Sequence, residues 1–256
     1  MSETKICDYD CYVSGMKKSI KDKLFFEGLI DDDVDTFVDF GCADGSVLAQ
    51  VAADFPEWKL IGIDNCPEMI SRAKRNCPAA FFCPSNDVIR NTDCKNAILN
   101  ISSVIHEIYS YCSEEEVKRF WNQIFSADYK YISIRDLMVN SAVNTESDIN
   151  DVRKIMSNAN SDQINSFVDC WGPLTVKRNM IHFLMKYRYQ ENWDREVREN
   201  YFPITVEHFL NLCPKNYEII YFNHYILPFN RSKIKDDFGI DLRDNTHVKI
   251  LLKRID

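Results

Sequence analysis

The chain has 256 residues, 45% of them hydrophobic and 12% aromatic, which suffices for a sizeable core in one α/β domain with an elaboration or in two small domains. Its formal net charge of −8 argues against a protein that grips nucleic acid over its whole surface, although a local basic groove remains open. No apolar run reaches the length of a membrane span and the N-terminus is unlike a signal peptide, so we expect a cytoplasmic protein without a membrane partner.

Ten cysteines are scattered between Cys7 and Cys213, and none forms a C-x-x-C pair. Most lie inside apolar segments, which favours reduced core thiols over a disulfide framework. The pair Cys7 and Cys11 has no second pair to complete a tetrahedral site, so we expect no bound metal.

The first element in the chain is an N-terminal helical arm over residues 9–30, where Val13, Met16 and Ile20 recur at helical spacing. A packing helix with a solvated lysine face is the plainer interpretation. The alternative is an arm that closes over a ligand.

Residues 36–40 form an apolar run that predicts a buried strand carrying one acid, Asp39. Small residues follow at Gly41, Ala43 and Gly45, and an amphipathic helix opens at Ser46. Small side chains in this turn allow the backbone to approach a ligand closely.

Residues 59–64 predict a second buried strand that ends in Asp64. A carboxylate at the carboxyl edge of a parallel sheet can accept both hydroxyls of a ribose. Two acids and a turn of small residues at these spacings indicate a nucleoside site on a doubly wound sheet.

The pattern Asp39-x-Gly41-x-Ala43-x-Gly45, followed by Gly62-Ile63-Asp64-Asn65, resembles the first motifs of class I S-adenosylmethionine-dependent methyltransferases. The resemblance implies S-adenosylmethionine as the cofactor, with the glycine turn at its methionine end and Asp64 at its ribose. Ala43 stands where glycine is commoner, a change that still permits backbone approach. A turn that only packs well is the plainer alternative.

A short third strand is expected at residues 81–83, and Asn86 and Asp87 follow its end. In the family this loop usually meets the adenine, where an amide or carboxylate can take the exocyclic amino group. A polar turn that caps the next segment explains the same residues equally well.

The fourth strand, residues 96–104, carries Asn100 and Ser102 on one side, and buried polar groups there need hydrogen-bond partners. The matching position in the family lines the cofactor. The fifth strand, from residue 129, ends at Arg135 and Asp136, which an ion pair within a loop would also explain.

Residues 137–201 lose the strand pattern and show helical spacings, which predicts a helical lid inserted between strands five and six. Residues 217–227 and 246–252 predict a final strand pair, with a basic loop at 229–235 between them. The expected fold over residues 1–256 is a single class I methyltransferase domain of the α/β class. It has a doubly wound, mostly parallel seven-stranded sheet, an antiparallel final strand pair, helices on both faces and the lid insertion.

Methyl transfer from a sulfonium is an in-line displacement, so the protein mainly holds a nucleophile in place, and a base is needed only if that nucleophile keeps its proton. The candidate bases are His106, Glu107 and Asp136, in that order, because an unperturbed imidazole titrates near neutrality. A histidine at a helix start is nevertheless more often a packing or capping residue.

Three functions remain open. An acidic chain with a helical lid favours a methyltransferase acting on a small molecule. Aromatic and basic residues in the lid favour RNA or another nucleic acid instead, although nearby acids dilute their charge. The Asn/Asp-Pro-Pro-aromatic motif of amino-group methyltransferases is absent, since Asn100-Ile101-Ser102-Ser103 stands there. A protein that binds S-adenosylmethionine without catalysis is the third.

Overall fold

The computed structural model describes residues 20–84 and 94–255 of the chain. They form two compact units. We call residues 20–84, 94–136, 213–223 and 248–255 the sheet unit, and residues 137–212 and 224–247 the helical unit. Within these ranges no helix is both long enough and apolar enough to cross a membrane.

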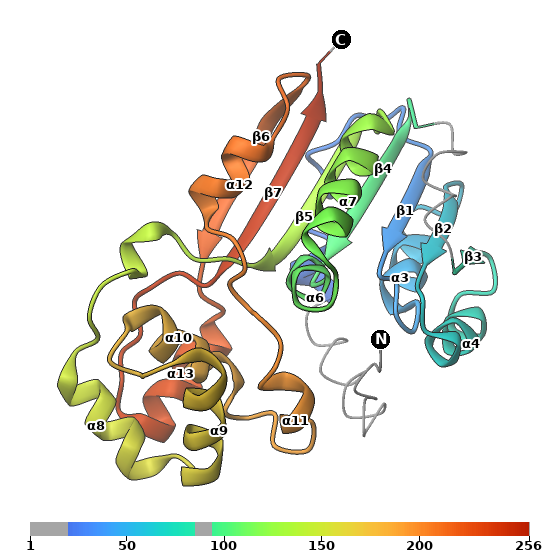
Figure 1. The fold of residues 1–256 in the computed structure, drawn as a ribbon. Coiled ribbons are helices and arrows are strands. Elements are labelled where there is room, and N and C mark those ends of the chain that lie inside the picture. The colour runs from blue at the N-terminus through green and yellow to red at the C-terminus, as the bar shows by residue number, and fades with distance from the viewer. Residues whose placement is uncertain (1–19, 85–93, 256) are drawn as a thin grey trace. The chain divides into compact units, whose positions relative to one another are not determined.

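The sheet unit is organised around a seven-stranded sheet with the strand order β3-β2-β1-β4-β5-β7-β6. Its strands are β1 (Thr36–Phe40), β2 (Lys59–Ile63), β3 (Phe81–Cys83), β4 (Ala97–Ser102), β5 (Tyr131–Leu137), β6 (Tyr217–Tyr225) and β7 (His247–Arg254). The first five pair in parallel, and β7 runs opposite to β5 (Figure 1). The predicted doubly wound sheet with an antiparallel final pair is therefore confirmed.

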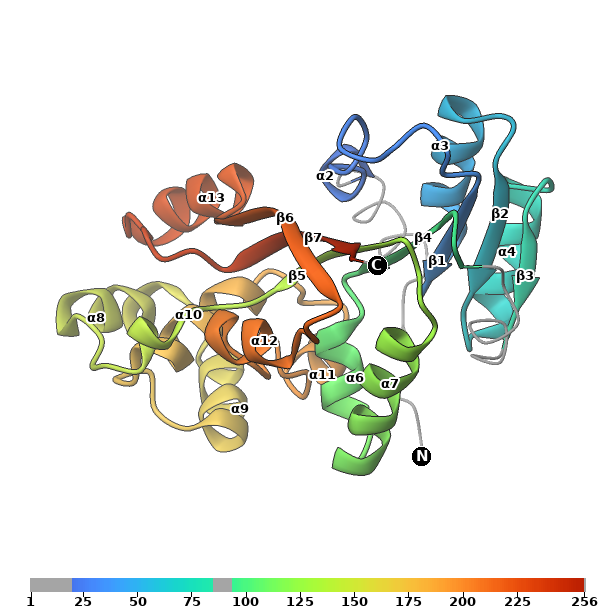
Figure 2. The ribbon, with the colours of Figure 1, turned by 90° about the horizontal axis from the view of Figure 1, so that it is seen from above.

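Helices cover both faces of this sheet. They are α2 (Ile20–Lys23), α3 (Ser46–Asp54), α4 (Pro67–Asn76), α6 (Ile105–Tyr111) and α7 (Glu114–Ser126). In the view from above, α2 and α3 lie on one side of the sheet, and α6 and α7 lie on the other (Figure 2). Helix α7 begins with a capping box, in which Ser113 and Glu116 satisfy each other's backbone N–H groups.

The N-terminal arm differs from its prediction in the part that the structure describes. Within the described residues helix α2 covers Ile20–Lys23, and turns follow it up to Leu29. Gly28 adopts a φ of +79°, a left-handed conformation that does not continue a helix. Leu24 and Phe26 are nevertheless buried, so after Lys23 the apolar residues pack from a turn and not from a continuation of the helix.

The helical unit contains the segment predicted as a lid and extends beyond it, to residue 212 and to residues 224–247. Its elements are η1 (Ser141–Val143), α8 (Ile149–Asn158), α9 (Ser161–Trp171), α10 (Lys177–Lys186), α11 (Trp193–Glu196), α12 (Val206–Leu212) and α13 (Pro228–Phe238). They enclose an apolar core of their own that includes Ile155, Phe167 and Phe183. Helical spacing predicted α8, α9 and α10 correctly.

Residues 229–235 were expected to form a loop, and this expectation is wrong because they lie in helix α13. Pro228 stands in the first turn, where its missing N–H costs nothing, and Gly239 ends the helix at a φ of +65°. Ile234 and Phe238 supply a narrow buried stripe, which the run of basic residues conceals in the sequence.

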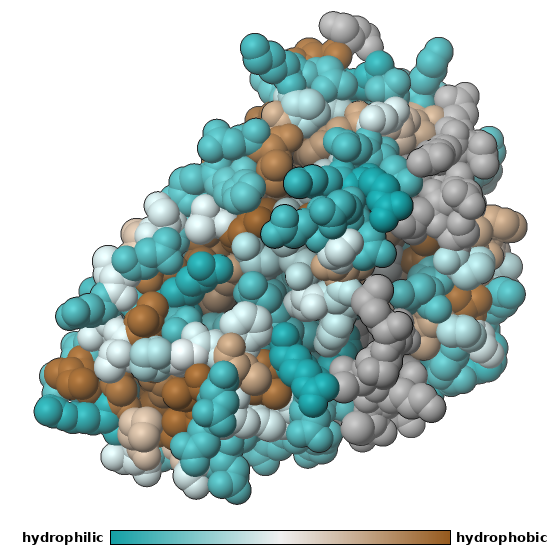
Figure 3. Space-filling view, in the orientation of Figure 1, coloured by the Kyte–Doolittle hydropathy of each residue, from teal (hydrophilic) through white to brown (hydrophobic). Residues whose placement is uncertain are grey.

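The surface that Figure 3 presents is mostly polar, with apolar side chains gathered towards its lower left. Several large apolar residues of the helical unit are exposed, namely Ile149, Met156, Val176, Tyr189, Leu210 and Phe229. Every cysteine within the described ranges is a free thiol, as the sequence predicted.

Candidate active site

The turn after β1 has a left-handed backbone conformation at each of its three small residues. Gly41, Ala43 and Gly45 have φ angles of +76°, +45° and +73°. A Cβ on Gly41 would lie 2.3 Å from the Val104 side chain, and one on Gly45 would lie 3.0 Å from Ala73. The glycines are therefore required by backbone conformation and by packing, in addition to any ligand that approaches the turn.

Asp64 joins this turn to the loop after β2. Its Oδ2 accepts a hydrogen bond from the Ala43 N–H at 2.8 Å, and its Oδ1 accepts one from the Cys66 N–H at 2.8 Å. The residue is half-buried, and Asn65 beside it is exposed. Asp64 therefore orders both the glycine turn and the loop after β2.

Asp39 and Asn100 form a buried polar pair across β1 and β4. They are direct neighbours in the parallel register, and Asn100 Nδ2 donates to Asp39 Oδ1 at 2.8 Å. Burial raises the pKa of Asp39 to about 6, because the bond from Asn100 and the charge of Lys23 offset only part of the desolvation. Asn100 Oδ1 has no hydrogen-bond partner within the described residues.

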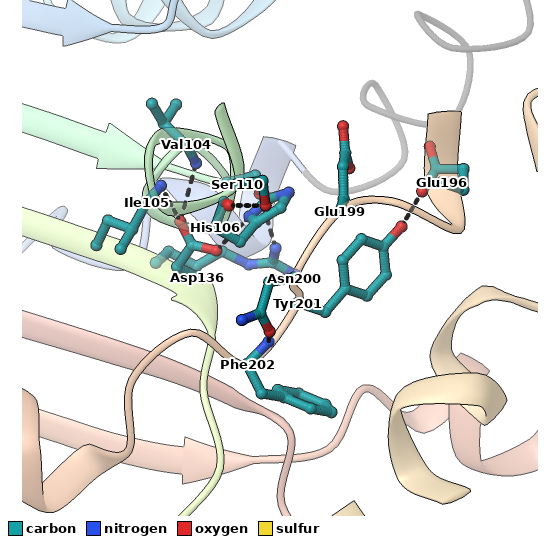
Figure 4. Close-up of polar contacts among 12 residues, drawn as sticks. Val104, Ile105, His106, Ser110, Asp136, Glu196, Glu199, Asn200, Tyr201 and Phe202 are labelled. Atoms are coloured by element: carbon teal, nitrogen blue, oxygen red, sulfur yellow. Dashed lines mark hydrogen bonds and ion pairs between the residues drawn. The ribbon is translucent and has the colours of Figure 1, made fainter. Parts of the chain in front are cut away.

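His106 and Asp136 form a second buried polar pair, at the start of α6 and the end of β5 (Figure 4). His106 Nδ1 lies 2.7 Å from Asp136 Oδ1. Asp136 Oδ2 accepts from the N–H groups of Val104 and Ile105 at 2.8 and 2.7 Å. Asp136 is fully buried and both of its oxygens are engaged, so its geometry suits it to orient His106.

The sequence predictions for the remaining site residues have mixed outcomes. Glu107 follows His106 in α6 and is half-buried. Asn86 and Asp87 lie outside the described residues. Arg135 forms an ion pair with Asp22 of helix α2, with 3.0 Å between Nε and Oδ2, so this pair joins a strand to a helix and is not the pair within a loop that the sequence suggested.

Two residues of this region went unnoticed in the sequence. Asp44 is buried and accepts hydrogen bonds from the backbone and hydroxyl of Ser46 and from the Asn76 side chain. The Asp-x-Ser spacing before a helix was a usable signal for this role. Lys23 lies on α2 and is buried. In the sequence it stands among lysines whose spacing predicts a solvated face, so the pattern gave no sign of its burial.

Comparison with known proteins identifies the domain that carries this geometry. Residues 37–127 match the family model described as a methyltransferase domain. The search among curated proteins gives no match.

Three solved structures illustrate the fold. The plantazolicin methyltransferase BamL, in complex with a triazolic desmethylPZN analog and SAH, is 14% identical over 97% of this chain and 88% of its own, with a TM-score of 0.52. A SAM-dependent methyltransferase from Anabaena variabilis ATCC 29413 is 13% identical over 93% and 84%, with a TM-score of 0.52. The methyltransferase domain of bacterial CtHen1-C is 12% identical over 94% and 99%, with a TM-score of 0.50. Residues 37–127 therefore resemble a methyltransferase domain, and the chain shares the fold of these methyltransferase structures.

Proposed function

We propose that this methyltransferase transfers the methyl group of S-adenosylmethionine to a small-molecule acceptor. The observation that carries the proposal is the bond between Asp64 and the Ala43 N–H, which brings the glycine turn and the ribose-binding acid together at one edge of the sheet. Asp39 and Asn100 lie on the two adjacent central strands. Carboxylates and an uncommitted amide oxygen suit a ligand that carries a sulfonium and an ammonium group.

Each predicted cofactor residue has a proposed place in this arrangement. Asp64 accepts from the ribose hydroxyls, and Gly41, Ala43 and Gly45 line the methionine end. The loop residue Asn65 and the segment with Asn86 and Asp87 are proposed to meet the nucleoside. Support for this cofactor comes from the plantazolicin methyltransferase structure, which was determined in complex with SAH.

His106 is the proposed general base, and Asp136 is the residue that positions it. The cofactor supplies a methyl group already activated for displacement by its sulfonium. The acceptor atom forms the new bond to the methyl carbon as the carbon–sulfur bond breaks, and His106 takes the proton that the acceptor releases. Because Asp136 fixes Nδ1, we assign the proton transfer to Nε2. Glu107 is the second candidate for this role.

The basic residues of the helical unit argue for a small acceptor over a nucleic acid. Lys186 is fully buried and donates to the carbonyls of Glu196 and Glu199, and Arg195 pairs with Glu199 at 2.8 Å. Lys177 pairs with Asp244 at 2.7 Å. These cations therefore interact with groups of the helical unit itself. A nucleic-acid site would need such cations to bind phosphates.

The aromatic residues of the same segment are occupied in a similar way. The Trp171 indole donates to the Val197 carbonyl, and the Trp193 indole donates to the Ser166 hydroxyl at 2.9 Å. A residue that stacks on a nucleotide needs a ring face that is open to solvent. Tyr189 is exposed, whereas Trp171 and Trp193 are half-buried. The ring nitrogens of Trp171 and Trp193 are therefore used within the helical unit itself.

Calorimetry with S-adenosylmethionine and S-adenosylhomocysteine tests the first half of the proposal. We expect both to bind with one site per chain, and no binding would refute the cofactor assignment.

A methyl-release assay against fractionated cell extract then asks for the acceptor without presuming its class. Activity in the small-molecule fraction supports the proposal. Salt-sensitive retention of RNA together with activity in the RNA fraction would favour the nucleic-acid alternative, and binding without release in any fraction would favour a non-catalytic protein.

A further inference from the structure

Asp44 is a buried carboxylate with no part in the proposed reaction. It lies in the glycine turn just before helix α3, and the residue is only 2% exposed. Its Oδ1 accepts from the Ser46 N–H at 3.1 Å, and its Oδ2 accepts from the Ser46 hydroxyl at 2.7 Å. The carboxylate therefore occupies the N-terminus of α3, where the helix dipole and the first N–H groups favour negative charge.

Helix α4 holds Asp44 in this position. Asn76 Nδ2 donates to the Asp44 carbonyl at 2.8 Å and to Asp44 Oδ2 at 3.2 Å. The same helix backs the next residue of the turn, since a Cβ on Gly45 would lie 3.0 Å from Ala73. The backbone and the side chain of Asp44 are therefore both tied to α4, which fixes the carboxylate at the N-terminus of α3.

The N–H groups of the turn donate to acceptors of the protein itself. Gly41 and Cys42 donate to the Ile63 carbonyl at 2.8 and 3.0 Å. Ala43 donates to Asp64 Oδ2 at 2.8 Å. A turn that cradles a phosphate offers such N–H groups to the phosphate oxygens instead. This turn is therefore built against a phosphate, even though it precedes a helix as phosphate-binding turns do.

Negative charge surrounds the same turn. The pKa of the Cys42 thiol is raised by burial first and then by the charges of Asp39, Asp64 and Asp44. The ammonium of Lys23, which the charges of Asp39 and Asp44 also reach, offsets part of this field. An anionic group brought into the turn therefore meets three carboxylates, whereas a cationic group is attracted by them.

A phosphorylated nucleoside differs from the cofactor in its 5′ substituent. Both ligands carry adenine and a ribose, so a ribose contact of Asp64 does not distinguish them. The cofactor has a sulfonium next to its 5′ carbon, whereas a nucleotide has a phosphate of opposite charge there. We propose that Asp44 excludes phosphorylated nucleosides from this site, because its fixed carboxylate takes the helix N-terminus that a phosphate would need. This inference rests on the proposed function, which supplies the nucleoside ligand.

The test compares adenosine with adenosine 5′-monophosphate, which differ only in the phosphate. Each is titrated as a competitor of S-adenosylhomocysteine in calorimetry. Repulsion between like charges a few ångströms apart inside a protein corresponds to at least about ten-fold in affinity. The wild-type protein should therefore bind adenosine more tightly than the monophosphate by at least about that factor. Equal binding of the two would overturn the proposal, and so would a failure of adenosine to displace S-adenosylhomocysteine.

Asp44→Asn then assigns the discrimination to one residue. The amide has the shape of the carboxylate and its oxygen can still accept from the Ser46 N–H, so charge is the main change. We expect the monophosphate to bind about ten-fold more tightly than it does to the wild type, and adenosine to change by less than about two-fold. Asp44→Ser, which keeps a hydroxyl for the helix N-terminus, is a second variant with the same expectation.

Asp54→Asn is the matched control for this pair of variants. It removes an exposed acid from the other end of the same helix, and it should leave the ratio of the two affinities unchanged. A wild-type ratio retained in both Asp44 variants would refute the assignment to Asp44. Failure of the wild-type protein to bind S-adenosylhomocysteine would instead refute the proposed function.

Discussion

The Asp39–Asn100 pair and the His106–Asp136 pair differ in how much of their hydrogen-bonding capacity the protein itself uses. Both pairs are buried: Asp39 and Asn100 lie in the carboxyl halves of β1 and β4, and Asp136 near the end of β5 meets His106 at the start of α6. Both oxygens of Asp136 are engaged by groups at the start of α6, namely the N–H groups of Val104 and Ile105 and the Nδ1 of His106. Asn100 Oδ1, in contrast, has no partner within the described ranges, and Asp39 has a raised pKa.

This difference separates residues that position others from residues that await a ligand. A carboxylate whose oxygens both accept from its own chain is preorganised, and it holds a neighbouring side chain in one orientation. A buried amide with an unused oxygen is incomplete until something binds. The hydrogen-bonding positions that the protein leaves unused on a buried group therefore indicate the role of that group better than its burial alone.

Removing the imidazole of His106 should have the largest effect. We expect His106→Ala to leave the affinity for S-adenosylhomocysteine unchanged and to lower turnover by at least about a hundred-fold, because general-base catalysis contributes that much or more. Turnover is measured with the active fraction from the methyl-release assay. His208→Ala, at an exposed histidine of α12, is the control and should retain full activity. A turnover unchanged in His106→Ala would show that no base acts there.

Asp64→Ala should act on binding rather than on the chemical step. Loss of the ribose acceptor and of the bond that orders Ala43 should weaken S-adenosylhomocysteine at least about a hundred-fold in calorimetry, since both charge-assisted bonds disappear together. Asp54→Ala, at an exposed acid that ends α3, is the matched control. Unchanged binding in Asp64→Ala would remove the ribose assignment.

The raised pKa of Asp39 predicts a pH dependence of stability. The carboxyl has a pKa of about 6 in the folded protein against a reference value of 3.8, so the native state binds the proton more tightly. Its favourable contribution is complete below the reference pKa and is lost as pH rises through about 6, a change of roughly 2–3 kcal/mol.

Asp39→Asn should remove this part of the pH dependence. The free energy of unfolding is measured by urea denaturation at pH 4 and pH 7.5 for both proteins. Relative to the wild type, the variant should be more stable at pH 7.5 than at pH 4. A difference independent of pH would show that Asp39 does not titrate in this range. The neutral side chain should also weaken cofactor binding, because an ammonium loses a nearby anion.

Gly41→Ala should have the smallest of the expected effects. It tests whether glycine is needed at this position for packing against Val104, independently of any ligand. A φ of +76° and the close approach to Val104 should together lower the free energy of unfolding by about 1–3 kcal/mol. Combining it with Val104→Ala should recover part of this loss, because the two residues compete for one space. Strictly additive losses in urea denaturation would show that the clash with Val104 is not the cause.

Local pattern in the sequence was sufficient for most of the sheet and the glycine turn. Apolar runs predicted β1 to β3 closely, and the acids at their ends predicted the edge at which Asp39 and Asp64 lie. Such runs predict parallel strands reliably because these strands are buried on both faces, so their consecutive residues are apolar. Helix α13 was missed, since its narrow apolar stripe gives almost no periodic signal.

What the sequence alone determined is therefore the order of the elements and the kind of residue at each strand end. Tertiary structure decided which partners those residues have. Asp136 was predicted as a base, but the register of β5 and the start of α6 occupy both of its oxygens. Lys23 belongs to the lysine face that the sequence predicts to be solvated, but it is buried on α2, where the neighbouring Asp22 pairs with residues of β5 and β7. The physical reason is that strand burial is a local property, whereas satisfaction of a hydrogen-bonding group depends on residues distant in the chain.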